Sequence, residues 1–193
     1  MNSVAPGKAV AVFGSSEPRP PSPAWQQAHE VGRLLAETGF VVVNGGYGGV
    51  MEASARGARE AGGHTIGVTT TAFAFRGAAN PFIETERRER DLFERTRGLI
   101  EEAAGFVVLP GRSGTLAELG LVWALHKAGL LGGKPIQMVG QVWEDLLTHL
   151  RRLDLLDPAV LEITGIAKDP RQAVDRLAAL LLPARPDRSG RPG

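Results

Sequence analysis

Residues 105–118 read Gly-Phe-Val-Val-Leu-Pro-Gly-Arg-Ser-Gly-Thr-Leu-Ala-Glu, an apolar run that passes into a glycine-bearing turn. The run at 105–109 shows no polar alternation, which is typical of a strand buried on both faces of a sheet. From residue 116 the apolar spacing becomes helical, and we expect a helix over 116–128. A buried strand, a tight turn and a helix in succession predict one unit of a parallel α/β sheet.

The same alternation continues along the chain in both directions. We expect further strands at 9–13, 40–43, 64–68, 134–139 and 163–167, and further helices at 25–36, 50–60, 86–102, 142–153 and 171–182. Residues 69–84 are expected to be a loop without regular structure, and loops of about 16 residues are usually functional or mobile. The pattern predicts the α/β class, as one doubly wound, three-layer α/β/α domain over 1–183 with a mainly parallel sheet. Residues 184–193 are expected to be disordered.

Glycine is over-represented, with 25 among 193 residues, which is about 13% against an average near 7%. The glycines lack the three-residue period of collagen. Several cluster directly after the strands expected at 9–13, 40–43 and 105–109. Ligands of doubly wound sheets bind at the carboxyl ends of the strands, so these clusters predict ligand-binding turns.

Composition excludes several classes of site. The chain has no cysteine, which excludes disulfides, zinc–thiolate sites and cysteine nucleophiles. The histidines have no metal-ligand spacing, so no metal is expected; they are His29, His64, His126 and His149. A net charge of +1 gives no general attraction to nucleic acid. No apolar stretch approaches 18 residues and residues 1–8 lack a signal core, so we expect no membrane association and a cytoplasmic location.

The turn at 110–115 has the features of a phosphate site. Gly111 and Gly114 carry no side chain that would block an anion, Arg112 adds positive charge, and Ser113 and Thr115 add hydroxyls. The first amides of the following helix lack intrahelical partners and lie at the positive end of the helix dipole. Together these features indicate a phosphate cradle.

A structural interpretation of the same residues stays open. Thr115 and Glu118 have the spacing of a capping box, in which Glu118 would bond back to the Thr115 backbone. The second glycine-rich turn, 44–49, is equally consistent with a strand–helix connection that needs positive φ.

Common cofactor motifs are missing. The chain contains neither G-x-G-x-x-G after a strand nor G-x-x-x-x-G-K-[S/T], which argues against a dinucleotide or ATP site. Its lysines lack a recognisable Schiff-base environment for pyridoxal phosphate; they are Lys8, Lys127, Lys134 and Lys168. We therefore expect no cofactor.

Two charged side chains differ from their neighbours. Residues 86–97 hold five arginines and four acids, mostly at spacings that suit a solvated helix face. Arg95 lies at the edge of the apolar stripe that is expected to turn Leu92, Phe93, Leu99 and Ile100 inward. Glu118 shares a stripe with Val122 and Leu125. A partly desolvated carboxylate beside an arginine is a candidate general base.

At these residues the sequence resembles the Lonely Guy (LOG) family of cytokinin-activating phosphoribohydrolases. The family signature P-G-G-x-G-T-x-x-E reads Pro-Gly-Arg-Ser-Gly-Thr-Leu-Ala-Glu at 110–118, and the family's E-R-K helix motif reads Glu-Arg-Thr at 94–96. The interval of 23 residues from Arg95 to Glu118 also matches, as do Gly-Gly-Tyr-Gly-Gly-Val-Met-Glu at 45–52 and Gly-Ser-Ser at 14–16. The resemblance covers roughly residues 9–150.

The resemblance implies a Rossmann-like homodimer that hydrolyses the N-glycosidic bond of AMP or N6-modified AMP to the free base and ribose 5-phosphate. It implies Arg95 and Glu118 as the catalytic pair and a nucleoside monophosphate as the small-molecule partner. The substrate-binding residues that it implies are Gly14, Ser15, Gly45, Gly46, Gly48, Gly49, Met51, Pro110, Gly111, Arg112, Ser113, Gly114 and Thr115.

Three positions depart from the family pattern. Arg112 replaces the second signature glycine, Thr96 replaces the usual lysine and Ala117 replaces the first of two usual glutamates. The alternative hypothesis is therefore a non-catalytic protein of the same superfamily that binds a nucleotide or the molybdenum cofactor.

Overall fold

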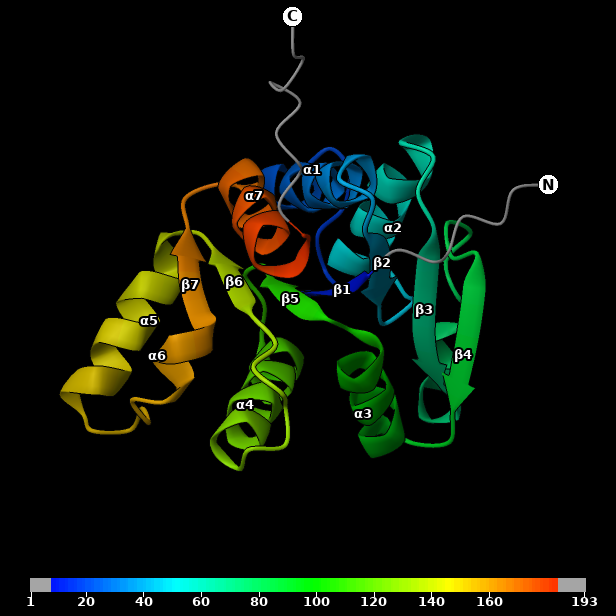
Figure 1. The fold of residues 1–193 in the computed structure, drawn as a ribbon. Coiled ribbons are helices and arrows are strands. Elements are labelled where there is room, and N and C mark those ends of the chain that lie inside the picture. Colours follow the sequence, from blue (N-terminus) through cyan, green and yellow to red (C-terminus); the bar gives the residue numbers. More distant parts are fainter. Residues whose placement is uncertain (1–7, 184–193) are drawn as a thin grey trace, which may run out of the picture.

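The computed structural model describes residues 8–183, which form one seven-stranded parallel sheet flanked by helices (Figure 1). The strand order is β4-β3-β2-β1-β5-β6-β7. The strands are β1 (Ala9–Phe13), β2 (Val41–Asn44), β3 (Thr65–Thr70), β4 (Thr85–Glu89), β5 (Gly105–Val108), β6 (Ile136–Val139) and β7 (Thr164–Ala167). The predicted α/β class and doubly wound parallel sheet are confirmed, and every strand pair is parallel. The tail predicted at 184–193 lies outside the described residues.

Helices cover both faces of the sheet. The helices are α1 (Pro23–Glu37), α2 (Val50–Glu60), η1 (Thr71–Arg76, a 3-10 helix), α3 (Leu92–Glu102), α4 (Ser113–Lys127), α5 (Gln141–Arg152), α6 (Val160–Ile163) and α7 (Pro170–Leu181). Figure 1 shows α1, α2 and α7 on one face and α3, α4 and α5 on the other. One buried cluster joins the first three helices to the sheet, and a second joins the other three.

The central strands are almost wholly apolar, as a sheet covered on both faces requires. Val10, Ala11 and Val42 have no exposed surface, and alternate residues of β1 belong to the two different core clusters. Burial of these side chains from water is the main stabilising contribution of the sheet.

Helices α1 and α2 pack unusually closely through two glycines. A Cβ at Gly32 would lie 1.9 Å from the Ser54 carbonyl oxygen, and a Cβ at Gly57 would lie 2.0 Å from that of His29. Any larger residue would push the helices apart. This contact fixes α2, whose first turn follows the glycine-rich turn at 44–49.

One predicted helix is wrong at its start. Residues 86–89 belong to the edge strand β4, and α3 begins only at Leu92, with the Asp91 side chain accepting a hydrogen bond from the Glu94 amide at 2.8 Å. The inward orientation predicted for two side chains is also wrong, because Leu92 is 47% and Phe93 83% exposed. The loop predicted at 69–84 contains the last residues of β3 and the 3-10 helix η1.

The topology brings three connections together. The chain winds outward from β1 to β4 and then returns to the other side of β1 as β5, so β2, β1 and β5 are adjacent. Their carboxyl ends lead into the three glycine turns, at the switch point where doubly wound sheets bind ligands. Within residues 8–183, no helix has both the length and the apolar character needed to cross a membrane.

Candidate functional site

The backbone of Ser15 joins the three glycine turns. Its amide donates to the Pro110 carbonyl oxygen at 3.3 Å, and its carbonyl oxygen accepts from the Val50 amide at 2.9 Å. A Cβ at Gly49 would lie 2.4 Å from the Ser16 carbonyl carbon, and Gly49 has a φ of 70°. Only glycine meets both conditions without strain, so the turns interlock at backbone level.

The turn at 44–49 is held from three sides. The Asn44 side chain accepts from the Gly46 amide at 2.9 Å and donates to the Met51 carbonyl oxygen at 2.9 Å. The Tyr47 hydroxyl donates to the Thr70 carbonyl oxygen and accepts from the Thr70 amide, both at 3.1 Å. Asn80 donates to the Tyr47 carbonyl oxygen at 2.9 Å. These bonds give a fixed position to the Tyr47 ring.

A cleft of about 530 Å³ opens at this edge of the sheet. Its walls come from the three turns, η1 and the helices α2, α3 and α4. The lining residues are Gly14, Ser15, Ser16, Glu17, Tyr47, Met51, Phe73, Leu92, Arg95, Thr96, Arg112, Ser113, Gly114, Thr115, Ala117 and Glu118. A volume of this size is typical of small-molecule sites.

Arg95 is a buried cation in the wall of this cleft, with 6% of its surface exposed. Its Nε donates to the Val68 carbonyl oxygen at 2.9 Å, and its guanidinium carbon lies 5.9 Å and 5.7 Å from the ring centres of Tyr47 and Phe73. A Cβ at Gly45 would lie 1.6 Å from Arg95 Nη2, so the glycine makes room for the guanidinium. Ring faces and a carbonyl compensate part of the cost of burying the charge.

Glu118 faces Arg95 across the cleft. Arg95 Nη1 lies 3.6 Å from Glu118 Oε1, and the Glu118 side chain is 14% exposed. Burial raises the pKa of Glu118 from 4.5 to about 7, and the Arg95 charge opposes part of that rise. A carboxyl group with its pKa near neutrality is suited to exchange protons with a ligand.

The first turn of α4 lines the cleft with Ser113, Gly114 and Thr115. The N-cap is Arg112, which makes no side-chain capping bond. The alternative in which Thr115 caps the helix and Glu118 completes a capping box is therefore wrong, because both residues lie inside α4. A Cβ at Gly111 would lie 2.1 Å from Thr115 Oγ1, so this glycine lets the buried Thr115 pack back against the turn.

The structure separates the sequence-predicted site residues into two groups. Nine line the cleft: Gly14, Ser15, Met51, Arg95, Arg112, Ser113, Gly114, Thr115 and Glu118. Six do not appear in its wall: Gly45, Gly46, Gly48, Gly49, Pro110 and Gly111. Gly45 and Gly49 instead permit close packing behind the wall, while Gly48 borders a neighbouring hollow with Arg19 and Glu52.

Sequence reasoning missed several lining residues, of which Tyr47 and Phe73 matter most. Their rings pack edge to face with centres 5.9 Å apart and cover the Arg95 guanidinium. The sequence did contain a signal for them: one aromatic residue stands in a glycine turn and the other in a long loop. Loops carry binding residues more often than core residues, so aromatic residues there indicate a binding site.

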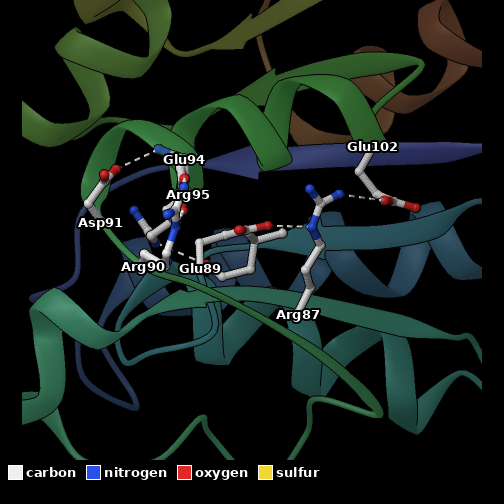
Figure 2. Close-up of polar contacts among 8 residues, drawn as sticks. Arg87, Glu89, Arg90, Asp91, Glu94, Arg95 and Glu102 are labelled. Carbon is white, nitrogen blue, oxygen red and sulfur yellow. Dashed lines mark hydrogen bonds and ion pairs between the residues drawn. The ribbon is translucent and has the colours of Figure 1, made fainter.

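The other charges around α3 form surface pairs. Figure 2 shows Arg90 with Glu94 on α3, and Arg87 between Glu89 and Glu102. Each pair has an exposed arginine, so solvent screens the interaction and it contributes little to stability. Among residues 8–183, no three acidic or histidine side chains gather in a way that could hold a metal ion.

Residues 7–149 match the model of the SLOG cluster4 family. A cytokinin riboside 5′-monophosphate phosphoribohydrolase of Mycobacterium tuberculosis is 35% identical over 133 residues, which are 67% of this chain and 69% of that protein. A probable enzyme of the same name from Oryza sativa is 27% identical over 178 residues, 88% of this chain and 70% of that protein.

Solved structures share the fold. A Northeast Structural Genomics Consortium target has a TM-score of 0.72 at 30% identity, covering 89% of this chain and 99% of its own. The molybdenum cofactor binding protein of Rippkaea orientalis has a TM-score of 0.72 at 21% identity, covering 92% and 99%. At that identity the likeness concerns the fold alone.

Proposed function

The chain belongs to the SLOG cluster4 / LOG family, and from that premise we propose that it is a nucleoside 5′-monophosphate phosphoribohydrolase. The reaction is hydrolysis of the N-glycosidic bond of AMP, or of AMP carrying an N6 substituent, to the free base and ribose 5-phosphate. The observation that carries the proposal is the Arg95–Glu118 pair, whose charged atoms lie 3.6 Å apart in a cleft that the first turn of α4 also lines.

The proposed chemistry follows from the charges that develop during cleavage. As the bond from C1′ to the base nitrogen breaks, positive charge appears on the ribose, and the Glu118 carboxylate stabilises it. The same carboxylate orients a water molecule and accepts its proton as the oxygen bonds to C1′. The base leaves with the electron pair of the broken bond and takes up the proton that Glu118 received from the water. The Arg95 charge favours the ionised form of Glu118, which burial disfavours.

The substrate phosphate is proposed to lie at the first turn of α4. Amides at a helix N-terminus attract anions, and Ser113 and Thr115 add hydroxyl donors there. The turn at 14–16 and the Tyr47 and Phe73 rings then hold the nucleoside, with the ribose beside Glu118.

Chromatography of AMP after incubation with the protein tests the proposal. Equimolar appearance of adenine and ribose 5-phosphate is the expected result. If AMP, GMP, CMP, UMP and N6-prenyl AMP all remain intact, the enzymatic function is wrong.

Binding without turnover is the second candidate function, for a nucleotide or a related ligand such as the molybdenum cofactor. The observation that favours it is that Thr96 and Ala117 both line the cleft, where the resemblance leads one to expect a lysine and a glutamate. If the chain binds AMP without cleaving it, installing Thr96→Lys and Ala117→Glu together should produce release of adenine.

We also infer that the chain pairs as a homodimer. Leu92, Phe93, Leu116 and Leu121 are between 39% and 83% exposed on the neighbouring helices α3 and α4, and a second copy would cover them. Sedimentation equilibrium should give twice the mass of one chain; a mass of one chain would overturn this inference.

A further inference from the structure

An ion pair joins two exposed side chains that line the cleft. Arg112 Nη1 donates to Glu17 Oε1 at 2.7 Å and so connects the turn after β5 to the loop after β1. Arg112 is 77% exposed and Glu17 is 57% exposed, and both line the cleft. Because Arg112 is the N-cap of α4, the pair lies directly beside the turn that offers amide donors.

The same pair borders a second hollow of about 470 Å³. This hollow shares Ser15, Glu17 and Arg112 with the cleft and continues along Pro18 and Pro110. The Glu17 and Arg112 side chains thus line both spaces. Both side chains are exposed, whereas the backbone beside them is held by the Ser15 hydrogen bonds described above.

Backbone geometry does not dictate which residue occupies position 112. Its φ of −105° and ψ of −152° are extended values that any residue adopts. The glycine of the family signature could therefore occupy position 112 too, but glycine has no cation for a ligand and no hydrogen-bond donor for Glu17. What distinguishes this chain at position 112 is therefore the arginine side chain, not the backbone.

We propose that the Glu17–Arg112 pair is a latch opened by the phosphate of the ligand: Arg112 leaves Glu17 for the phosphate and thereby selects phosphorylated ligands over free nucleosides. The inference rests on the proposed function in one respect, since it takes the ligand phosphate to lie at the start of α4. Glu17 holds Arg112 in the empty cleft and competes with the phosphate for it.

The relative strengths of the two partners favour the exchange. An exposed ion pair such as Arg112–Glu17 usually shifts an equilibrium by about fivefold or less. A phosphate carries up to two negative charges and three acceptor oxygens, and a guanidinium binds it through two parallel hydrogen bonds. Arg112 therefore binds more strongly to the phosphate than to the single carboxylate that it leaves.

Titration calorimetry with ribose 5-phosphate and with adenosine tests the latch. Ribose 5-phosphate has no N-glycosidic bond, and adenosine has no phosphate. Neither probe is therefore a substrate of the proposed reaction, so turnover does not interfere. Arg112→Ala should weaken binding of ribose 5-phosphate by about tenfold or more and leave adenosine within about twofold. Glu17→Gln should tighten ribose 5-phosphate by about two- to fivefold, because the competing carboxylate is gone.

Matched controls come from ion pairs outside the cleft. Arg90→Ala removes an exposed arginine that pairs with Glu94, and Asp157→Asn removes an exposed carboxylate that pairs with Lys127. Both controls should leave the two affinities within about twofold of the unaltered chain. Thermal unfolding of each variant verifies that it is folded before titration.

Three results would overturn the latch. They are equal effects of Arg112→Ala and Arg90→Ala, tighter binding of ribose 5-phosphate by Arg112→Ala, and no binding of ribose 5-phosphate by the unaltered chain. Failure of the proposed function has a different outcome: AMP stays intact while ribose 5-phosphate still binds through Arg112.

Discussion

Replacing Glu118 by glutamine should stabilise the folded chain at neutral and alkaline pH. In the folded chain the pKa of Glu118 is raised by burial from 4.5 to about 7. Above pH 7 the folded protein therefore contains an ionised carboxylate in an unfavourable environment. Glutamine has nearly the same shape and carries no charge, so it removes this cost while keeping the packing of α4.

The size and pH window follow from proton linkage. Between about pH 4.5 and 7 the folded chain holds a proton on Glu118 that the unfolded chain has released, so stability falls as pH rises across this window. The difference between the two pKa values corresponds to about 3 kcal/mol. Glu118→Gln should thus add roughly 3 kcal/mol to the free energy of unfolding at pH 8 and far less at pH 5.

Urea denaturation of both proteins at pH 5 and pH 8 measures the effect. Glu144→Gln, which alters an exposed carboxylate at the start of α5, is the control for removing one negative charge. The reasoning is refuted if Glu118→Gln is less stable than the unaltered chain at pH 8, or if its stability difference is the same at both pH values.

Three further predictions concern the cleft and α3. Gly45→Ala places a Cβ 1.6 Å from Arg95 Nη2, so we expect the rate of AMP hydrolysis to fall by about 100-fold. The control is Gly120→Ala, whose Cβ meets no atom within 4 Å and which should leave the rate unchanged. The rate of AMP hydrolysis should rise about tenfold per pH unit up to the Glu118 pKa of about 7 and then level off, because the ionised carboxylate is the active form. A rate that falls through this pH range would contradict the role assigned to Glu118. Asp91→Ala removes the side chain that accepts from the Glu94 amide and should lower the free energy of unfolding by about 1 kcal/mol in urea titrations, and an unchanged midpoint would show that this cap is dispensable.

Strong local patterns made most of the sheet predictable. Apart from Asn44 at the end of β2, strands β1, β2 and β5 contain no polar side chain, and they lead into glycine turns. Residues 9–13, 40–43 and 105–109 therefore indicated buried parallel strands, within one residue of the observed bounds. Because the carboxyl ends of parallel strands lie at the same edge of a sheet, the three turns could be placed together at that edge.

The edge strand β4 could not be recognised from its own residues. Thr85–Glu89 is a charged segment, mostly exposed, that pairs with β3 on one side only. Charges on an edge strand prevent pairing with other chains, but in sequence they look like the solvated face of a helix. The pairing with β3, a long-range contact, decided the structure.

The site was predictable in its charges and less so in its surroundings. The stripe positions of Arg95 and Glu118 indicated partial burial, whereas their separation depends on how α3 and α4 pack against the sheet. The Tyr47 and Phe73 rings reach Arg95 from different loops, which no local pattern specifies. Gly45 was predicted to bind ligand, but its place behind Arg95 makes it a spacer for the guanidinium.

The most direct test of the proposed function compares release of ribose 5-phosphate from saturating AMP by the unaltered chain and by Glu118→Gln. The proposed role of Glu118 predicts release by the unaltered chain and none by the variant, with both proteins binding AMP to a similar extent. Equal release by the two proteins, or none by either, would contradict it.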